Sequence, residues 1–548
     1  MQPDKQTWQV LGFSLALSAS LAAAFAYLRS GIGWPFEVRV FQHLSLYQDY
    51  YTIVPYVAIL LLGLLPSMRQ AGIGVARWIS RNVWWVALGA TAAFAIGTQV
   101  VYHAHTLSLD EYLVLFQSKI FAQGKLAGQF PPQLMDWLVP VDFRGKFIVV
   151  AENGAVASAY WPGFSLLLLP FEALGLPWLL NPLIGGATLL IAHRIALRLF
   201  GSAESAGLVV LLTLGSQAVC INALSFYTMP AHLLANGLFM LLLLSPSPAR
   251  ALFAGLVGSC ALVLHNPLPH LLFALPWIVW QGFRPERSSL LPALAAGYLP
   301  IGLALGWGWA IFLASLERGT SMSELATPGE AVRIFLDRLG AVSNWAHGSL
   351  IEMRTLDFGK LWLWSSPALV PAAVLGAMQA WRERSPWDPV IGAVVLTYAA
   401  YSLMPFAQGH GWGYRYFHPA WLMLPLLAAG AARGAARSAL PGYLAACALL
   451  SLAILTSLRT LQVEQFIARH LAQGPAAESA TARLVFVNPQ TGYYSWDLVQ
   501  NDPFLRNRIV MLYSQGMPAD RALVSAQFPN YELQSFDARG SVWGSARR

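Results

Sequence analysis

Long apolar segments, separated by short polar stretches, fill most of the chain between residues 9 and 458. A helix needs about 20 mainly apolar residues to cross the roughly 30 Å hydrocarbon core of a bilayer. Such segments lie near residues 9–28, 50–66, 83–102, 178–197, 205–224, 226–244, 250–265, 267–281, 290–313, 361–380, 388–406, 418–436 and 440–458. The pattern therefore predicts an all-α polytopic membrane protein with about thirteen transmembrane helices.

Arginines in the short polar stretches predict the orientation of these helices. They occupy alternate loops, at Arg69, Arg77, Arg81, Arg194, Arg198, Arg250, Arg284, Arg287, Arg382, Arg384, Arg433 and Arg437. Short loops rich in arginine and lysine stay in the cytoplasm. This orientation places residues 103–177, residues 314–360 and the tail from about residue 459 outside the cytoplasm.

Residues 162–176 are apolar, but they are too short for a span, and Pro170 and Glu172 interrupt them. A span here would also move Arg194 and Arg198 to the outer side, against the orientation of the other loops. We therefore interpret residues 162–176 as an interfacial or re-entrant helix on the outer face.

The tail differs in character from the rest of the chain. Residues Arg483–Asn488 and Arg508–Tyr513 are typical of short strands, with loop-like Asn, Asp, Pro and Tyr between them. We expect a small extracytoplasmic α/β domain at residues 459–548. Before it we expect an N-terminal pair of transmembrane helices at residues 1–82 and a larger transmembrane module at residues 83–458, which includes the external residues 103–177.

The composition agrees with a membrane protein. Hydrophobic residues make up 56% of the chain and charged residues only 11%, too few to cover several soluble domains. Cys220, Cys260 and Cys447 lie in apolar runs, which argues against a disulfide framework. The formal charge of +8 is scattered in short pairs, so we expect membrane lipids and no nucleic acid as partners.

The first external segment carries the clearest candidate chemistry. Asp110 and Glu111 follow a predicted span directly, in the sequence His103-Ala-His-Thr-Leu-Ser-Leu-Asp-Glu-Tyr112. Partial burial raises the pKa of a carboxyl group toward values useful in acid–base catalysis. The plainer alternative is a pair of carboxylates that suits the N-terminal end of a helix. Further along the same segment, Phe116, Ile120 and Phe121 recur at helical spacing. We expect the helix that they form to lie on the bilayer.

Three features together resemble a known family. They are the Asp110-Glu-Tyr112 segment, the later Tyr160-Trp-Pro-Gly-Phe-Ser-Leu-Leu-Leu-Leu-Pro-Phe171 segment, and the basic helix end Ala192-His-Arg-Ile-Ala-Leu-Arg-Leu-Phe-Gly201. The combination resembles the GT-C glycosyltransferases, and in particular the branch of protein O-mannosyltransferases and bacterial aminoarabinose transferases. The resemblance covers roughly residues 83–300, and the tail resembles nothing in that family.

This resemblance implies a glycosyltransferase that moves a sugar from a polyprenyl-phosphate donor to a glycan, lipid or protein acceptor. It places the active site on the outer side of a bacterial cytoplasmic membrane. Asp110 would activate the acceptor, Glu111 would support it or contact the substrate, and Tyr160 would help to bind the substrate. The family also implies an inverting displacement.

Partners for the donor phosphate are expected from a second segment, Gln408-Gly-His-Gly-Trp-Gly-Tyr-Arg-Tyr-Phe-His-Pro419. Its glycines permit close backbone approach, and Arg415 can bind phosphate through two parallel hydrogen bonds. We add His410 and Tyr414 from the same segment as binding residues. The alternative is an interfacial aromatic belt with one arginine that reaches the headgroups.

Further candidates are His232 and His265, which lie at the outer ends of predicted spans, and Lys119 in the first external segment. Ionisable groups at membrane depth are candidates for function, although a single histidine is more often a packing residue. Lys119 is suited to phosphate or to the anionic membrane surface.

The spacing of His103, His105, Asp110 and Glu111 is not a recognised metal signature. We name no certain cofactor, and a divalent metal stays an open alternative that we do not favour.

Two other function classes also stay open: a transporter or flippase of a lipid-linked or small solute, and a non-catalytic scaffold in envelope assembly. The large external segments and the lack of repeat symmetry argue against the transporter.

Overall fold

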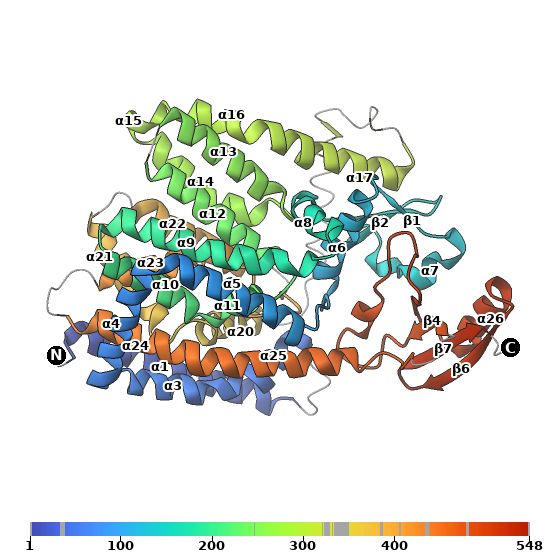
Figure 1. Ribbon diagram of the computed structural model, residues 1–548, viewed down its shortest axis with the longest axis horizontal. Helices are drawn as coiled ribbons and strands as arrows, with labels where there is room; N and C mark the ends of the chain where they lie inside the picture. Colours follow the sequence, from blue (N-terminus) through green and yellow to red (C-terminus); the bar gives the residue numbers. More distant parts are fainter. Residues whose placement is uncertain are drawn as a thin grey trace. The chain divides into compact units, whose positions relative to one another are not determined.

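The computed structural model describes residues 3–32, 39–245, 247–320, 322, 329–330, 333, 350–383, 387–404, 407–432, 438–477 and 482–545. The chain divides into two compact units (Figure 1). The first, the helical unit, contains residues 1–99, 178–303 and 345–462. The second, the loop–tail unit, contains residues 100–177, 304–344 and 463–548.

The helical unit is built from apolar helices joined by short turns. Its longer helices are α1 (Lys5–Ser30), α3 (Ile53–Leu62), α4 (Pro66–Arg81), α5 (Val83–Val100), α9 (Leu180–Phe200), α10 (Ala203–Leu214), α12 (Met229–Leu243), α13 (Pro248–Val263), α14 (Leu268–Gly282), α16 (Leu291–Ile301), α20 (Leu350–Leu363), α21 (Leu369–Glu383), α22 (Trp387–Ser402), α23 (Met423–Ala431), α24 (Leu440–Leu450) and α25 (Thr456–Leu471). The shorter ones are α2 (Val40–His43), η1 (Leu44–Asp49), η2 (Tyr50–Thr52), η5 (Pro177–Leu179), α11 (Gln217–Asn222), α15 (Pro285–Ser288), η7 (His418–Ala420) and η8 (Ser451–Leu455).

Five helical stretches among the described residues are long and apolar enough to cross a membrane. They are Lys5–Ser30, Val83–Val100, Pro177–Phe200, Pro285–Arg318 and Leu440–Leu471. A sixth follows if Val40–Leu62 and Pro66–Arg81, which meet at an angle of 93°, form one span. The predicted count of about thirteen spans is therefore not confirmed, although apolar helices do dominate the chain.

Breaks inside predicted spans account for part of the difference. The predicted span at 361–380 is divided, because α20 ends at Leu363 and α21 begins at Leu369. Ala368, in the break, has a φ of 70° that no continuous helix contains. The predicted span at 205–224 is likewise divided into α10 and α11. Hydropathy averaged over the length of a span does not locate such short breaks, although Ser365, Ser366 and Pro367 lie in the first and Gly215 and Ser216 in the second.

Close helix packing in this unit uses small residues. Helices α13 and α16 lie along each other (Figure 1). A Cβ atom on Gly255 would lie 2.1 Å from the carbonyl oxygen of Leu294, and one on Gly297 would lie 2.2 Å from that of Leu252. Only glycine fits at both positions, as is typical of tightly packed membrane helices.

The loop–tail unit combines helices with two small sheets. Its helices are α6 (Leu109–Phe121), η3 (Pro132–Leu134), α7 (Met135–Leu138), η4 (Val141–Phe143), α8 (Gly163–Ala173), η6 (Gly302–Trp307), α17 (Gly308–Arg318), η9 (Ser495–Leu498) and α26 (Met517–Gln527). Strands β1 (Gly128–Gln129), β3 (Ala155–Ser158) and β2 (Ile148–Val150) form an antiparallel sheet.

The tail forms the second sheet, in the order β5-β4-β7-β6. Its strands are β4 (Ala482–Val487), β5 (Val510–Tyr513), β6 (Tyr531–Asp537) and β7 (Gly540–Ser545). Strands β4 and β5 are parallel, with Leu484 opposite Val510, and the other pairs are antiparallel. The two strands predicted from the sequence, at 483–488 and 508–513, are therefore confirmed.

One hydrophobic core joins residues 109–156 to the tail. It contains Leu113, Phe116 and Ile120 of α6 together with Phe486 of β4 and Trp543 of β7. A separate C-terminal domain is therefore not confirmed, because the tail shares this core with residues 109–156. From this shared core we expect residues 109–156 and the tail to lie on the same side of a membrane.

The sequence predicts that the apolar face of α6 lies on the bilayer. This prediction is wrong, because protein and not lipid covers Phe116 and Ile120 on that face. Phe116 and Ile120 are fully buried in the protein core, and Phe121 packs with Trp309 of α17.

Helix α8 has only 11 residues, about half the length that a span needs, which agrees with the interpretation of residues 162–176. Arg384, Arg433, Arg437 and most of residues 319–349 lie outside the described residues.

Candidate active site

The first turn of α6 carries both predicted catalytic carboxylates. Ser108 precedes the helix in an extended conformation, and Asp110 and Glu111 follow in the first turn, where the exposed N–H groups favour negative charge. Glu111 is fully buried, and its carboxylate accepts a hydrogen bond of 2.6 Å from the backbone N–H of Leu107. Asp110 is only partly buried. Of the two, Asp110 is the better placed to meet a substrate.

Tyr160 lies beside Asp110, as the prediction of a common site requires. The Tyr160 hydroxyl donates a hydrogen bond to the Asp110 carboxylate. The indole N–H of Trp309 donates to the backbone carbonyl of Tyr160 at 2.9 Å, and the Phe147 ring meets the Tyr160 ring edge-on. These contacts hold the tyrosine in place, so it can orient Asp110.

A third carboxylate, Asp497, joins this cluster from the tail. It lies in η9 and is buried, and it accepts a hydrogen bond of 3.3 Å from the backbone N–H of Leu109. Burial, and then the negative charges of Asp110 and Glu111, raise the pKa of Asp497 well above its ordinary range. Sequence reasoning missed this residue, because Asp497 and Asp110 are distant in the chain and only the fold brings them together.

Lys119, at the other end of α6, lies close to an acidic residue of α8. Burial raises the pKa of Glu172, and the positive charge of Lys119 partly offsets that rise. Lys119 therefore has a carboxylate neighbour within the loop–tail unit. Its predicted contact with a donor phosphate stays a prediction.

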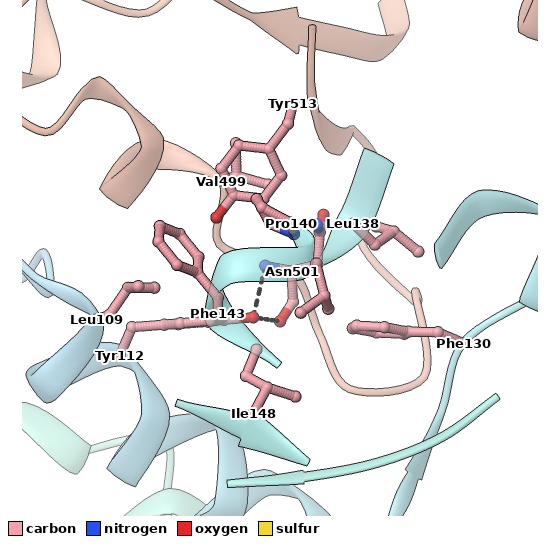
Figure 2. A pocket seen from close by; sticks show the side chains of 11 residues that line it. Leu109, Tyr112, Phe130, Leu138, Pro140, Phe143, Ile148, Val499, Asn501 and Tyr513 are labelled. Atoms are coloured by element: carbon pink, nitrogen blue, oxygen red, sulfur yellow. Dashed lines mark hydrogen bonds between the residues drawn. The ribbon is translucent and has the colours of Figure 1, made fainter. Parts of the chain in front are cut away.

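A small cavity lies near α6 (Figure 2). Its walls are mainly apolar and include Leu109, Phe130 and Phe143. The hydroxyl of Tyr112 donates to the backbone carbonyl of Asn501 at 2.7 Å and accepts from the backbone N–H of Asn501 at 2.9 Å. The cavity volume of about 10 Å³ is roughly that needed for one water molecule, too small for a sugar.

In the helical unit, the glycine-rich segment that precedes η7 holds Arg415 in a fixed position. Gly409, Gly411 and Gly413 have φ values of 68°, 127° and 67°, which are unfavourable for other residues. A Cβ atom on Gly411 would lie 2.3 Å from Cδ of Arg415. The glycines therefore make the tight loop and leave room for the arginine.

Arg415 is buried, with only 4% of its surface exposed. Its guanidinium lies over the Tyr227 ring, 4.6 Å from the ring centre. Its backbone N–H donates to the side-chain oxygen of Gln408 at 2.9 Å. A buried arginine stacked on an aromatic ring is not the exposed arginine of an interfacial belt, in which the head group stays in water.

The other predicted residues of this segment lie close by in the chain and are also buried. His410 is 3% exposed and Tyr414 is 1% exposed. The Tyr414 ring contacts the rings of Tyr398 and Tyr416. The segment is tied to α11 by a hydrogen bond of 2.9 Å from the Asn222 side chain to the Trp412 carbonyl.

His232 and His265 occur in a group of histidines within the helical unit. His265, His270 and His418 all lie within electrostatic range of His232. His270 is hydrogen-bonded through its two ring nitrogens to Asn236 and to the Tyr298 hydroxyl, each at 2.7 Å. In the described part of the chain, no three His, Cys, Asp or Glu side chains are arranged to hold a metal ion.

Sequence reasoning also missed a buried ionic cluster in the helical unit. The Asp49 carboxylate accepts hydrogen bonds from Lys360 at 3.0 Å, Arg459 at 2.5 Å and the Trp364 indole at 3.0 Å. The exposed fraction of each charged side chain is at most 1%. The charges come from η1, α20 and α25, so no local sequence pattern reveals the cluster.

These features define a class of protein: a polytopic helical membrane protein in which residues 100–177 and the tail belong to one α/β unit around a carboxylate-bearing helix. Neither a family model nor a curated protein sequence matches the chain. Solved structures do match its fold. The chain is similar to ArnT from Cupriavidus metallidurans bound to undecaprenyl phosphate, with a TM-score of 0.52 and 13% identity.

That match covers 84% of this chain and 98% of the ArnT chain. The apo structure of the same ArnT has a TM-score of 0.49 at 13% identity, with the same coverage. The match to the ArnT structure bound to undecaprenyl phosphate confirms, at the level of the fold, the resemblance predicted from the sequence. The chain has an ArnT-like fold, and its long apolar helices indicate an integral membrane protein.

Proposed function

We propose that the protein is a membrane glycosyltransferase that takes a sugar from a polyprenyl-phosphate donor. The observation that carries this proposal is the ArnT-like fold, because one ArnT structure contains undecaprenyl phosphate. The partly buried carboxylate of Asp110, oriented by the Tyr160 hydroxyl, supports it from this chain's own residues. The acceptor is a glycan, lipid or protein on the outer side of a bacterial cytoplasmic membrane.

Asp110 acts as the general base in this proposal. It takes the proton of the acceptor hydroxyl while the hydroxyl oxygen bonds to the anomeric carbon of the sugar. The bond between that carbon and the phosphate oxygen breaks, and polyprenyl phosphate leaves with the electron pair. Attack from the face opposite the phosphate inverts the anomeric carbon. Tyr160 keeps the carboxylate oriented, and Glu111 holds the turn that carries it.

Arg415 stabilises the leaving phosphate in this proposal. A guanidinium offers two parallel N–H groups to phosphate oxygens, and charge that develops on the leaving group is best met by groups already in position. Burial over Tyr227 keeps Arg415 in one orientation. His410, Tyr414, His232, His265 and Lys119 complete the proposed binding set, with the lipid chain held by the apolar helices.

The division of the chain into residues 1–82, 83–458 and 459–548 is part of the same proposal. The middle segment would carry the catalytic and donor-binding residues, since it contains both Asp110 and Arg415. The transferred sugar is a pentose or a hexose. Selection of the acceptor would fall to the outer surface of the loop–tail unit, which includes the segment after residue 459.

Binding of undecaprenyl phosphate tests the donor class, because this lipid is the product whatever sugar is transferred. The purified protein in detergent should melt at a higher temperature when undecaprenyl phosphate is added. Arg415→Ala should abolish the shift, whereas Arg415→Lys should keep part of it, because lysine retains the charge without the planar fork. Arg250→Ala, at the exposed start of α13, is the control that should behave as wild type. An equal shift in Arg415→Ala and wild type would remove Arg415 from the donor site.

A further inference from the structure

The start of α6 lacks the usual cap from its own sequence. Ser108 occupies the N-cap position, but its side chain accepts no hydrogen bond from the first turn. The first N–H groups of a helix need an acceptor, and Ser, Thr, Asp or Asn at the N-cap normally supplies it. Here Asp497, 388 residues away in sequence, accepts from the backbone N–H of Leu109. The tail therefore supplies the cap of the helix that carries Asp110.

Two neighbours of Asp497 strengthen this attachment. The Gln500 amide donates to the carbonyl of Thr106 at 2.6 Å and to that of Asp497 at 2.8 Å, and the Thr106 hydroxyl donates to the Gln500 side-chain oxygen. Asn501 exchanges two hydrogen bonds with the Tyr112 hydroxyl. Residues 497–501 therefore form hydrogen bonds at three places around the start of α6: with Thr106 before the helix, with Leu109 at its first residue and with Tyr112 in its first turns.

We infer that Asp497 is a positioning residue for sugar transfer: it caps α6 and so fixes the direction in which Asp110 faces the acceptor. This inference rests on the proposed function. The cap requires an acceptor oxygen at this position and does not require a negative charge.

The environment of the Asp497 carboxyl group agrees with a cap that needs an acceptor oxygen and no negative charge. The carboxyl is buried, and Asp110 and Glu111 of α6 are the negative charges that face it, so its pKa lies well above the ordinary range. A raised pKa favours the uncharged carboxyl group, whose carbonyl oxygen still accepts a hydrogen bond.

Three variants separate the cap from the charge. Asp497→Asn keeps an acceptor oxygen without a charge, Asp497→Ala removes the acceptor, and Asp520→Ala is the control. Asp520 is also a buried carboxylate of the tail, but it accepts from Trp137, Ser514 and Gln515 instead of α6. The assay follows release of undecaprenyl phosphate from synthetic undecaprenyl-phosphate-linked pentoses and hexoses, in acceptor-containing membranes of a deletion strain.

We expect Asp497→Ala to lower kcat by on the order of 10²-fold, the effect of a misplaced catalytic group, with little change in the KM for the donor. Asp497→Asn should stay within threefold of wild type, as expected when the capping oxygen is kept. Amide hydrogen exchange over residues 106–113 should rise in Asp497→Ala, but not in Asp497→Asn or Asp520→Ala. A wild-type kcat for folded Asp497→Ala, or an Asp497→Asn variant as impaired as Asp497→Ala, would overturn the inference.

The same assay distinguishes failure of this inference from failure of the proposed function. If wild type releases no undecaprenyl phosphate from any of the linked sugars, the proposed function fails, and the exchange measurement alone still tests the cap. If wild type is active and Asp497→Ala matches it, only the positioning role fails.

Discussion

Asp49→Asn tests how strongly the buried ionic cluster stabilises the helical unit. Among the described residues, Asp49 forms ion pairs with both Lys360 and Arg459, and all three side chains are at most 1% exposed. Asparagine has nearly the same shape, but it leaves two buried cations without their counter-charge. Removal of one member of a buried ion pair costs about 3–5 kcal/mol.

Two cations lose their partner in this case, so we expect a loss near the upper end, about 5 kcal/mol. Unfolding in mixed detergent–SDS micelles, followed by tryptophan fluorescence, measures it. The double variant Asp49→Asn, Lys360→Met removes one stranded cation and should recover about half of the loss or more, because an apolar side chain of similar size often replaces a buried charge well.

Glu204→Gln provides the matched control. Glu204 pairs with Arg77 at 3.0 Å, but the two side chains are 43% and 57% exposed, and exposed pairs contribute about 0–1 kcal/mol. The reasoning is refuted if Asp49→Asn unfolds within about 1 kcal/mol of wild type, like the control, or if the double variant is no more stable than Asp49→Asn.

Two further predictions concern the loop–tail unit. First, single cysteines are placed at the exposed positions Gln123 and Ser535, in a Cys260→Ser background. Both should react with an impermeant thiol reagent in intact spheroplasts, because the segment that contains Gln123 and the tail share one core. Reaction at only one position would contradict the shared core. Second, burial, and then the charge of His103, lower the pKa of His105 to about 4, so the neutral form is favoured in the folded unit. This stabilisation is fully present above about pH 6.5, the ordinary value, and is lost as the pH falls toward 4. His105→Asn should therefore lose less thermal stability between pH 7 and pH 4 than wild type, and parallel pH curves for the two proteins would contradict the assignment.

Hydrophobic patterning predicted the membrane class and the two strands of the tail, and the resemblance of three sequence segments to the GT-C proteins predicted the fold. The patterned features follow from local sequence: runs of apolar residues, and β-branched runs between polar turns. The glycines of the segment before η7 are visible in the sequence, and their positive φ values give a physical reason for glycine at these positions.

Features that depend on distant contacts were missed. Asp497 looks like an ordinary loop aspartate until the fold places it against Leu109. Lys360 and Arg459 look like the flanking charges of spans until Asp49 is found between them. The apolar face of α6 was assigned to the bilayer, because periodicity shows that a face is apolar but not whether lipid or protein covers it.

The most direct test of the central claim is transfer by Asp110→Asn. Asparagine keeps the shape and the hydrogen bond from Tyr160 but cannot take the proton of an acceptor hydroxyl. Envelope glycans and lipids of a deletion strain that carries wild type, Asp110→Asn or no gene are compared by mass spectrometry, with equal protein levels in the membrane. The account predicts that the Asp110→Asn strain lacks the same modification as the strain without the gene. Full modification in the Asp110→Asn strain would contradict it.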